Sequence, residues 1–240
     1  MTIVSPPRGD AARTQPWLIV SAGAICWGAL AFVVLHLVSG RDPLRDAVSL
    51  YAFTDQAPGL LAVSILWVAF GSVTTVGALA AAGVPLSRTT KVLFGLWSGG
   101  LALAAVFPVS YGQLSSLVSG EIHQYACVAA FLSVPAIGLS LAAGTRGIPA
   151  LARDRATVLR WTRYSMAGLV LFAVSYLLDK SAGVPLGTIL PVGLTQRITL
   201  VIDIGLLCAV IRLAYGASAS SRTARPITAA PGYADLSPGR

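Results

Sequence analysis

The chain has 240 residues, of which 55% are apolar and only 11% are charged, and its mean hydropathy is +0.77. Soluble domains carry about 25% charged residues, so this composition excludes a water-soluble globular fold. The net charge of +8 would suggest nucleic acid on a soluble protein. Here nearly all of the charges fall between or beyond the apolar segments, which argues against a nucleic-acid partner.

Six segments are long and apolar enough, or nearly so, to cross a bilayer, whose apolar core takes about 20 helical residues. They lie at residues 17–38, 60–82, 92–109, 123–143, 160–178 and 196–214. The sequence therefore predicts an all-α, polytopic membrane bundle of six transmembrane helices over residues 16–215. The flanking segments, 1–15 and 216–240, lack apolar periodicity and are predicted to be disordered.

Basic residues are divided unequally between the two ends of the predicted spans. Thirteen Lys and Arg residues fall on the side of the N-terminus, the 83–91 loop, the 144–160 loop and the C-terminal tail. Four fall on the other side, namely Arg41, Arg45, Lys180 and Arg197. Because positive charge is retained in the cytoplasm, this asymmetry predicts cytoplasmic N- and C-termini in the cell (inner or plasma) membrane, with membrane lipids as partners.

Two outer loops contain signs of short helices. In the 39–59 loop, Asp42-Pro43 is typical of an N-cap followed by Pro at the first helical position. Apolar residues follow at helical spacing, namely Leu44, Ala47, Val48 and Tyr51. We expect a short amphipathic helix on the outer surface here. The 110–122 loop, with Leu114, Leu117 and Val118, is expected to form a second one.

Polar and ionisable side chains gather at the same outer level. They are His36 near the end of span 1, Glu121 and His123 opening span 4, Asp179 closing span 5, Gln196 and Arg197 opening span 6, and Asp203 about two turns deeper. Charges at membrane depth are costly, so we expect them to face the bundle interior and to find partners on other spans. Two interpretations stay open: a polar pocket that opens to the outer leaflet, or a structural network that ties the helix ends together.

Three kinds of chemistry are possible with these residue types. His123 with Asp203 or Glu121 would supply general acid–base catalysis, although residues 121 and 123 are two apart and point to different helix faces. His36 and His123, on different spans, would suit the axial ligands of one haem. No short ligand spacing predicts a metal site, and the sequence identifies no cofactor.

Several short motifs occur in a fixed order relative to the six spans. The outer Asp-Pro is followed by Ser49-Leu50-Tyr51, and span 3 ends in Phe107-Pro108. Span 4 opens with Gly120-Glu121-Ile122-His123, and span 6 opens with Gly193-Leu194-Thr195-Gln196-Arg197. Over about residues 15–215, this order resembles the bacterial membrane family called domain of unknown function 998, common in actinobacteria.

The resemblance implies an integral membrane protein of about six helices and no established reaction. The positions that match the family pattern are Ser49, Tyr51, Phe107, Pro108, His123 and Arg197. The family typically has an acidic residue soon after the Phe-Pro, whereas this chain continues with Val109-Ser110. If that acid takes part in a family activity, this chain departs from it.

The leading functional hypothesis is an integral membrane protein that binds a lipid or another hydrophobic small molecule in an outer-leaflet pocket. The candidate binding residues are Ser49, Tyr51, Arg197, Asp179 and His36. One alternative is a membrane-embedded enzyme that acts on a lipid or isoprenoid-like substrate through His123 with Asp203 or Glu121. A small carrier or a single-haem redox protein is a further alternative, and the sequence does not specify the oligomeric state.

Overall fold

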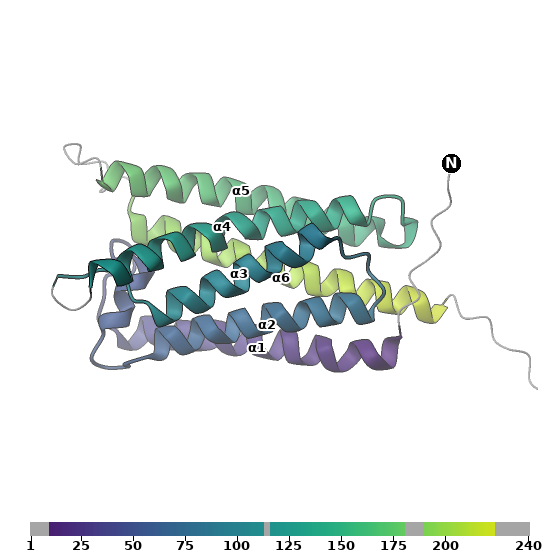
Figure 1. Cartoon of the computed structure of the whole chain (residues 1–240), viewed down its shortest axis with the longest axis horizontal. Coiled ribbons are helices and arrows are strands. Elements are labelled where there is room, and N and C mark those ends of the chain that lie inside the picture. The colour runs from purple at the N-terminus through teal and green to yellow at the C-terminus, as the bar shows by residue number, and fades with distance from the viewer. Residues whose placement is uncertain (1–9, 113–115, 181–189, 224–240) are drawn as a thin grey trace, which may run out of the picture.

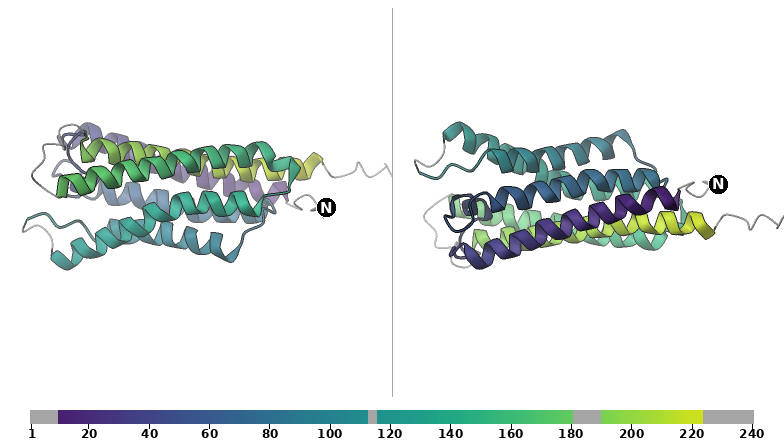
Figure 2. Two further views of the ribbon diagram at one scale, coloured as in Figure 1. Left: turned by 90° about the horizontal axis from the view of Figure 1, so that it is seen from above. Right: turned by 90° about the horizontal axis from the view of Figure 1, so that it is seen from below.

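The structure, a computed structural model, describes residues 10–112, 116–180 and 190–223. In chain order its elements are α1 (Ala11–Val38), the 3-10 helix η1 (Val48–Phe53), α2 (Leu60–Ala81), α3 (Arg88–Val106), α4 (Leu117–Gly144), the 3-10 helix η2 (Pro149–Leu151), α5 (Ala152–Lys180) and α6 (Val192–Thr223). The long helices run side by side along the long axis of the bundle (Figures 1 and 2). Within the described residues the fold is all-helical, which confirms the predicted class.

Five helices, α1, α2, α3, α4 and α6, are long and apolar enough to cross a membrane. The fifth of the six predicted spans lies in α5, which is not among them. The first half of α5 is strongly charged, with Arg153, Asp154, Arg155, Arg160 and Arg163. Large apolar side chains are exposed along the helices, for example Leu37 of α1, Val106 of α3 and Val201 of α6. Apolar surface of this extent suits helices that have an apolar environment around them.

The first and last helices extend beyond the predicted span region. Asp10 caps the start of α1 by accepting a hydrogen bond from the Ala12 N–H at 3.0 Å, and α6 continues to Thr223. These ends pass the predicted boundaries at residues 16 and 215, because hydropathy marks only the apolar part of a helix and residues such as Ala continue it. The rest of the two predicted tails, 1–9 and 224–240, lies outside the described residues.

The first outer loop differs from the predicted surface helix. Asp42 Oδ1 accepts the backbone N–H of Leu44 at 2.8 Å, so this residue caps a turn, and the helix that follows is η1. Val48 and Tyr51 of η1 are buried against apolar side chains of α1 and α2. As a result, η1 covers one end of the bundle, which we call the η1 end.

The second predicted outer helix is not a separate element. Leu117 and Val118 form the first turn of α4, and Ser116 caps it by accepting the Ser119 N–H at 3.1 Å. Leu114 lies outside the described residues. The serine cap explains why the helix begins six residues before the predicted span at 123. It satisfies a backbone N–H group of the first turn, and a cap of this kind is not part of the apolar pattern from which the span was predicted.

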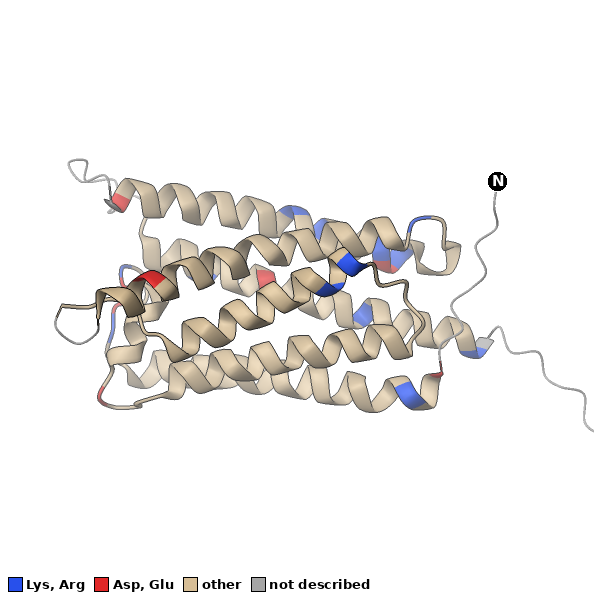
Figure 3. Ribbon diagram, viewed as in Figure 1, with Lys and Arg blue, Asp and Glu red and all other residues tan. Residues whose placement is uncertain are grey.

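The long helices form a ring in chain order. Each packs against the next, and α1 also packs against α6, which closes the ring. Small residues bring α1 and α2 close together, because a Cβ atom added to Gly28 would lie 2.8 Å from the Ser64 carbonyl oxygen. The ring places the start of α1 and the end of α6 at the same end of the bundle, and Lys and Arg residues concentrate towards that end (Figures 1 and 3).

Candidate ligand-binding site

Arg197 organises a polar cluster at the η1 end. It lies in the second turn of α6, and its guanidinium donates four hydrogen bonds of 2.7–2.8 Å. The acceptors are His36 Nε2, the Asp46 and Gly193 carbonyl oxygens, and the Tyr51 hydroxyl. The guanidinium carbon also lies 5.2 Å from the centre of the Tyr51 ring, a cation–π distance. Arg197 thereby joins α1, η1 and the turn before η1 to α6.

The hydrogen bonds of His36 fix its tautomer. Arginine only donates, so His36 Nε2 must accept, and the proton is on Nδ1, which lies 2.8 Å from the Phe32 carbonyl oxygen. The ring is therefore neutral and both of its nitrogens are engaged. A haem iron would need the lone pair that Arg197 already uses, so this arrangement does not fit the single-haem alternative.

His123 has a second set of partners. It is 8% exposed, and its Nδ1 lies 3.0 Å from the Ala104 carbonyl oxygen and 2.8 Å from that of Phe107, at the end of α3. Nδ1 is therefore the N–H donor, and Nε2 can accept the Cys127 thiol at 3.5 Å. His123 satisfies carbonyl groups that the end of a helix leaves without intrahelical partners.

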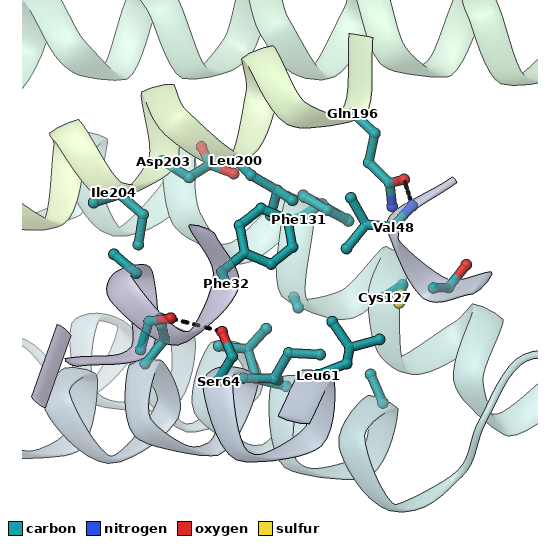
Figure 4. Close-up of a pocket in the computed structure, with 18 of the residues that line it drawn as sticks. Phe32, Val48, Leu61, Ser64, Cys127, Phe131, Gln196, Leu200, Asp203 and Ile204 are labelled. Atoms are coloured by element: carbon teal, nitrogen blue, oxygen red, sulfur yellow. Dashed lines mark hydrogen bonds between the residues drawn. The ribbon is translucent and has the colours of Figure 1, made fainter. Parts of the chain in front are cut away.

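A cavity of about 260 Å³ lies inside the ring, between η1 and the middle of the bundle. We call it the main cavity. Its wall is mostly apolar and comes from α1, η1, α2, α3, α4 and α6. The lining residues are Gly28, Ala29, Phe32, Val33, Val48, Ser49, Leu61, Ser64, Ile65, Val68, Trp97, Leu101, Ala104, His123, Cys127, Ala130, Phe131, Gln196, Leu200, Val201, Asp203 and Ile204. Figure 4 shows Asp203, Leu200 and Ile204 of α6 on one side and Leu61 and Ser64 of α2 on the other.

Asp203 brings a carboxyl group to this apolar wall. It is 1% exposed, and its Oδ1 accepts a hydrogen bond of 2.6 Å from the Ser165 hydroxyl of α5. This partner on another helix is what the cost of a buried charge led us to expect. The other oxygen, Oδ2, is buried and has no hydrogen-bond partner in the described structure.

The wall of the main cavity meets the outer side of the bundle in one place and a second cavity in another. Two of the lining residues, Val33 of α1 and Val201 of α6, are 54% and 69% exposed, so this part of the wall also forms part of the outer side of the bundle. At the η1 end, the main cavity shares Ser49, His123 and three other lining residues with a second cavity of about 190 Å³. The Val48 N–H donates to Gln196 Oε1 at 2.8 Å and holds η1 over the main cavity.

The predicted site residues thus separate into three groups. His36, Tyr51 and Arg197 form the polar cluster, and Ser49, His123 and Asp203 line the main cavity. Glu121 and Asp179 are exposed, and neither has a hydrogen bond or ion pair in the described structure. His123 and Asp203 therefore share a cavity wall, whereas His123 and Glu121 do not share a site. The catalytic role of these residues stays a prediction.

Sequence reasoning missed Ser165 and Cys127 as site residues. Serine is common inside apolar helices, where it usually bonds to its own backbone, so its type alone gives no signal. The signal that was available came from Asp203, since a buried carboxyl group requires a donor on a neighbouring helix. The helix that supplies the donor follows only from the ring order.

These features define an all-helical bundle with membrane-like helices, a polar cluster at one end and an internal apolar cavity. The chain belongs to the family described as protein of unknown function (DUF998), whose model matches residues 20–228. This match confirms the family resemblance over most of the chain. No curated protein and no solved structure matches the chain.

Proposed function

We propose that this protein is an integral membrane protein that binds a hydrophobic small molecule or a lipid chain in the main cavity. The observation that carries the proposal is a mostly apolar cavity of about 260 Å³ inside a ring of membrane-like helices. Ligand sites are typically concave, mostly apolar and equipped with a few placed polar groups. Ser49, His123, Gln196 and Asp203 are such groups here.

The surroundings of the cavity favour a ligand that comes from the membrane. The exposed lining residues Val33 and Val201 support an entrance on the apolar side of the bundle, where an acyl or isoprenoid-like chain would enter without crossing water. At the η1 end, Arg197 and Gln196 hold a cap over the cavity. The polar cluster therefore acts in this proposal as the support of the cap, and the ligand occupies the space beneath it.

The proposed orientation of the protein in the membrane rests on the distribution of its charges. Lys and Arg concentrate at the end of the bundle where α1 begins and α6 ends, and by the positive-inside rule this supports a cytoplasmic location of that end (Figure 3). We propose that all six long helices cross the cell membrane and that both termini are cytoplasmic. The η1 end and the main cavity then belong to the outer half of the bilayer.

Native mass spectrometry of the full chain, purified in mild detergent, tests the binding function. Ala104 lines both cavities, so Ala104→Phe places a ring in the space that the ligand would occupy. Leu103 is the adjacent residue of α3 and is 47% exposed, which makes Leu103→Phe the matched control. We expect a bound hydrophobic species in the wild type and in Leu103→Phe, and its loss in Ala104→Phe.

A bound species that is retained in Ala104→Phe would contradict binding in the main cavity. The same comparison separates a specific ligand from detergent or annular lipid, because such molecules contact the outer surface, which both variants share. A wild type that carries no adduct after extraction and exposure to total membrane lipids would also contradict the proposal.

A further inference from the structure

One residue of the main cavity wall has a carboxyl oxygen without a hydrogen-bond partner. Among the described residues, the buried side-chain polar atoms without a hydrogen-bond partner are Ser98 Oγ and Asp203 Oδ2. Ser98 is not among the residues that line the main cavity, whereas Asp203 is. An ionised carboxylate can only accept hydrogen bonds, and a buried oxygen without a donor raises the free energy of the folded state. The ionised Asp203 side chain therefore prefers a molecule that supplies a donor.

Several other polar groups of this wall already have partners. The Ser64 hydroxyl donates to the Gly28 carbonyl oxygen at 2.7 Å, and Gln196 Oε1 accepts the Val48 N–H. His123 Nδ1 is held by two carbonyl oxygens at the end of α3. Beside Asp203, α6 contributes Leu200 and Ile204, and the Phe32 ring lies close by (Figure 4). A molecule bound beside Asp203 therefore meets its carboxyl group within apolar surroundings.

This arrangement suits an amphiphile better than a lone water. A buried water is stable where it has two to four polar partners, and the apolar neighbours of Asp203 do not provide them. The volume of about 260 Å³ is far larger than the roughly 10–15 Å³ that one water needs, so the cavity has space for several atoms of an apolar chain. The remainder of a longer chain would leave through the proposed entrance at Val33 and Val201.

We infer that the ligand of the main cavity is an apolar chain that carries one terminal hydrogen-bond donor, a hydroxyl or an amine, and that this donor binds Asp203 Oδ2. The inference rests on the proposed function and adds the chemical class of the ligand. Ser165 acts as a positioning residue, because its hydroxyl donates to Oδ1 and leaves Oδ2 without a protein donor.

Two isomers of equal size test the inference. 1-Octanol has a donor, whereas heptyl methyl ether has the same nine non-hydrogen atoms and can only accept. The readout is the shift in Tm of the full chain in lipid nanodiscs as each compound is titrated. Ala104→Phe in the same nanodiscs gives the contribution of the bilayer, which is subtracted. We expect an apparent affinity about tenfold higher for octanol than for the ether, the usual effect of one unmade hydrogen bond to a buried group.

Asp203→Asn changes the preference in a defined direction. The amide oxygen can still accept from Ser165, and the amide nitrogen then presents donors to the cavity in place of Oδ2. We therefore expect this variant to prefer the ether over octanol. Asp179→Asn, at an exposed carboxylate on α5 outside the cavity wall, is the matched control and should behave like the wild type. Octylamine, of the same length, shows whether the donor is a hydroxyl or an ammonium group.

Each outcome of this experiment decides a specific point. Equal shifts with octanol and the ether in the wild type would overturn the donor preference and leave binding in the cavity intact. Shifts no larger than those of Ala104→Phe for all three compounds would overturn the proposed function itself. The comparison in the wild type alone decides the inference even if Asp203→Asn does not fold.

Discussion

Arg197 shows how one side chain can hold a cap in place. Its four hydrogen bonds use donors on three of its nitrogens, and two of them reach residues 46 and 51 of the segment that covers the main cavity. A lysine has a single nitrogen and cannot reproduce this spread of acceptors. The neutral ring of His36 supports the arrangement by offering a lone pair where a charged imidazolium would repel the guanidinium.

Replacement of Arg197 by Met is expected to release the cap. The substitution removes the hydrogen bonds to the Asp46 carbonyl oxygen and the Tyr51 hydroxyl, and we expect a loss of about 2–3 kcal/mol in the free energy of unfolding. Hydrogen exchange at residues 44–51 should increase by at least tenfold. Arg45→Met, at an exposed arginine of the same segment, is the control and should leave both quantities unchanged. Unchanged exchange in Arg197→Met would show that the cap is held by other contacts.

The packing of α1 on α2 depends on residues without large side chains. A Cβ atom added to Gly71 would lie 2.6 Å from Ile25 Cγ1 and 3.1 Å from the Ser21 carbonyl oxygen. The Ser21 hydroxyl also donates to Thr74 Oγ1 at 3.0 Å across the same interface. Close approach of this kind is characteristic of helices that associate through van der Waals packing and interhelical hydrogen bonds.

Gly71→Leu is therefore expected to separate the two helices and lower stability by about 1–3 kcal/mol. Gly23 of α1 provides the control, since a Cβ atom there would have nothing within 4 Å. Gly23→Leu should leave Tm in detergent unchanged or slightly raised, because leucine has the higher helix propensity. A Gly71→Leu variant as stable as the wild type would show that the interface adapts by a shift of whole helices.

Hydropathy located every long helix but not its full extent. The apolar segment at residues 160–178 lies within α5, which begins at Ala152. The first turns of α5 are charged, so their hydropathy is that of a loop and did not reveal that they are helical. The segment at 39–59 was expected to be a surface helix, because spacing reports which residues are apolar and not which neighbours bury them. Tyr51 is 1% exposed only because α1 and α2 meet beside it.

The partners of the site residues were less predictable from the sequence than the positions of the helices. The sequence indicated that polar groups gather at one level and that each needs a partner on another helix. It did not indicate that Arg197 would meet His36, 161 residues away, or that Asp203 would meet Ser165. Such pairs depend on the rotation of each helix about its own axis, which packing of the whole ring determines. The cavity is likewise a property of the assembled ring.

The number of helices that cross the membrane is a property of the whole chain. If α5 crosses with the other five, the total is even and both termini lie on the same side, as the arrangement of α1 and α6 requires (Figure 1). We expect a C-terminal fusion to green fluorescent protein to be fluorescent and one to alkaline phosphatase to be inactive.

Cysteine labelling provides the complementary measurement of topology. In a variant without native cysteines, Asp55→Cys at the η1 end should react with an impermeant maleimide in intact cells. Arg146→Cys, between α4 and α5, should react only after the cells are opened. An active phosphatase fusion at the C-terminus, or labelling of Arg146→Cys in intact cells, would contradict six crossings with cytoplasmic termini.

The ring closes where α1 meets α6, which is synthesised after it. Until α6 emerges from the ribosome and inserts, α1 has no partner on one side, and the chain has neither Asp203 nor Arg197. In the proposed function the entrance to the cavity lies at the seam between α1 and α6, and no connecting loop joins these two helices. A protein with this function would enclose a molecule from the bilayer in the course of its own biosynthesis, as α6 takes its place.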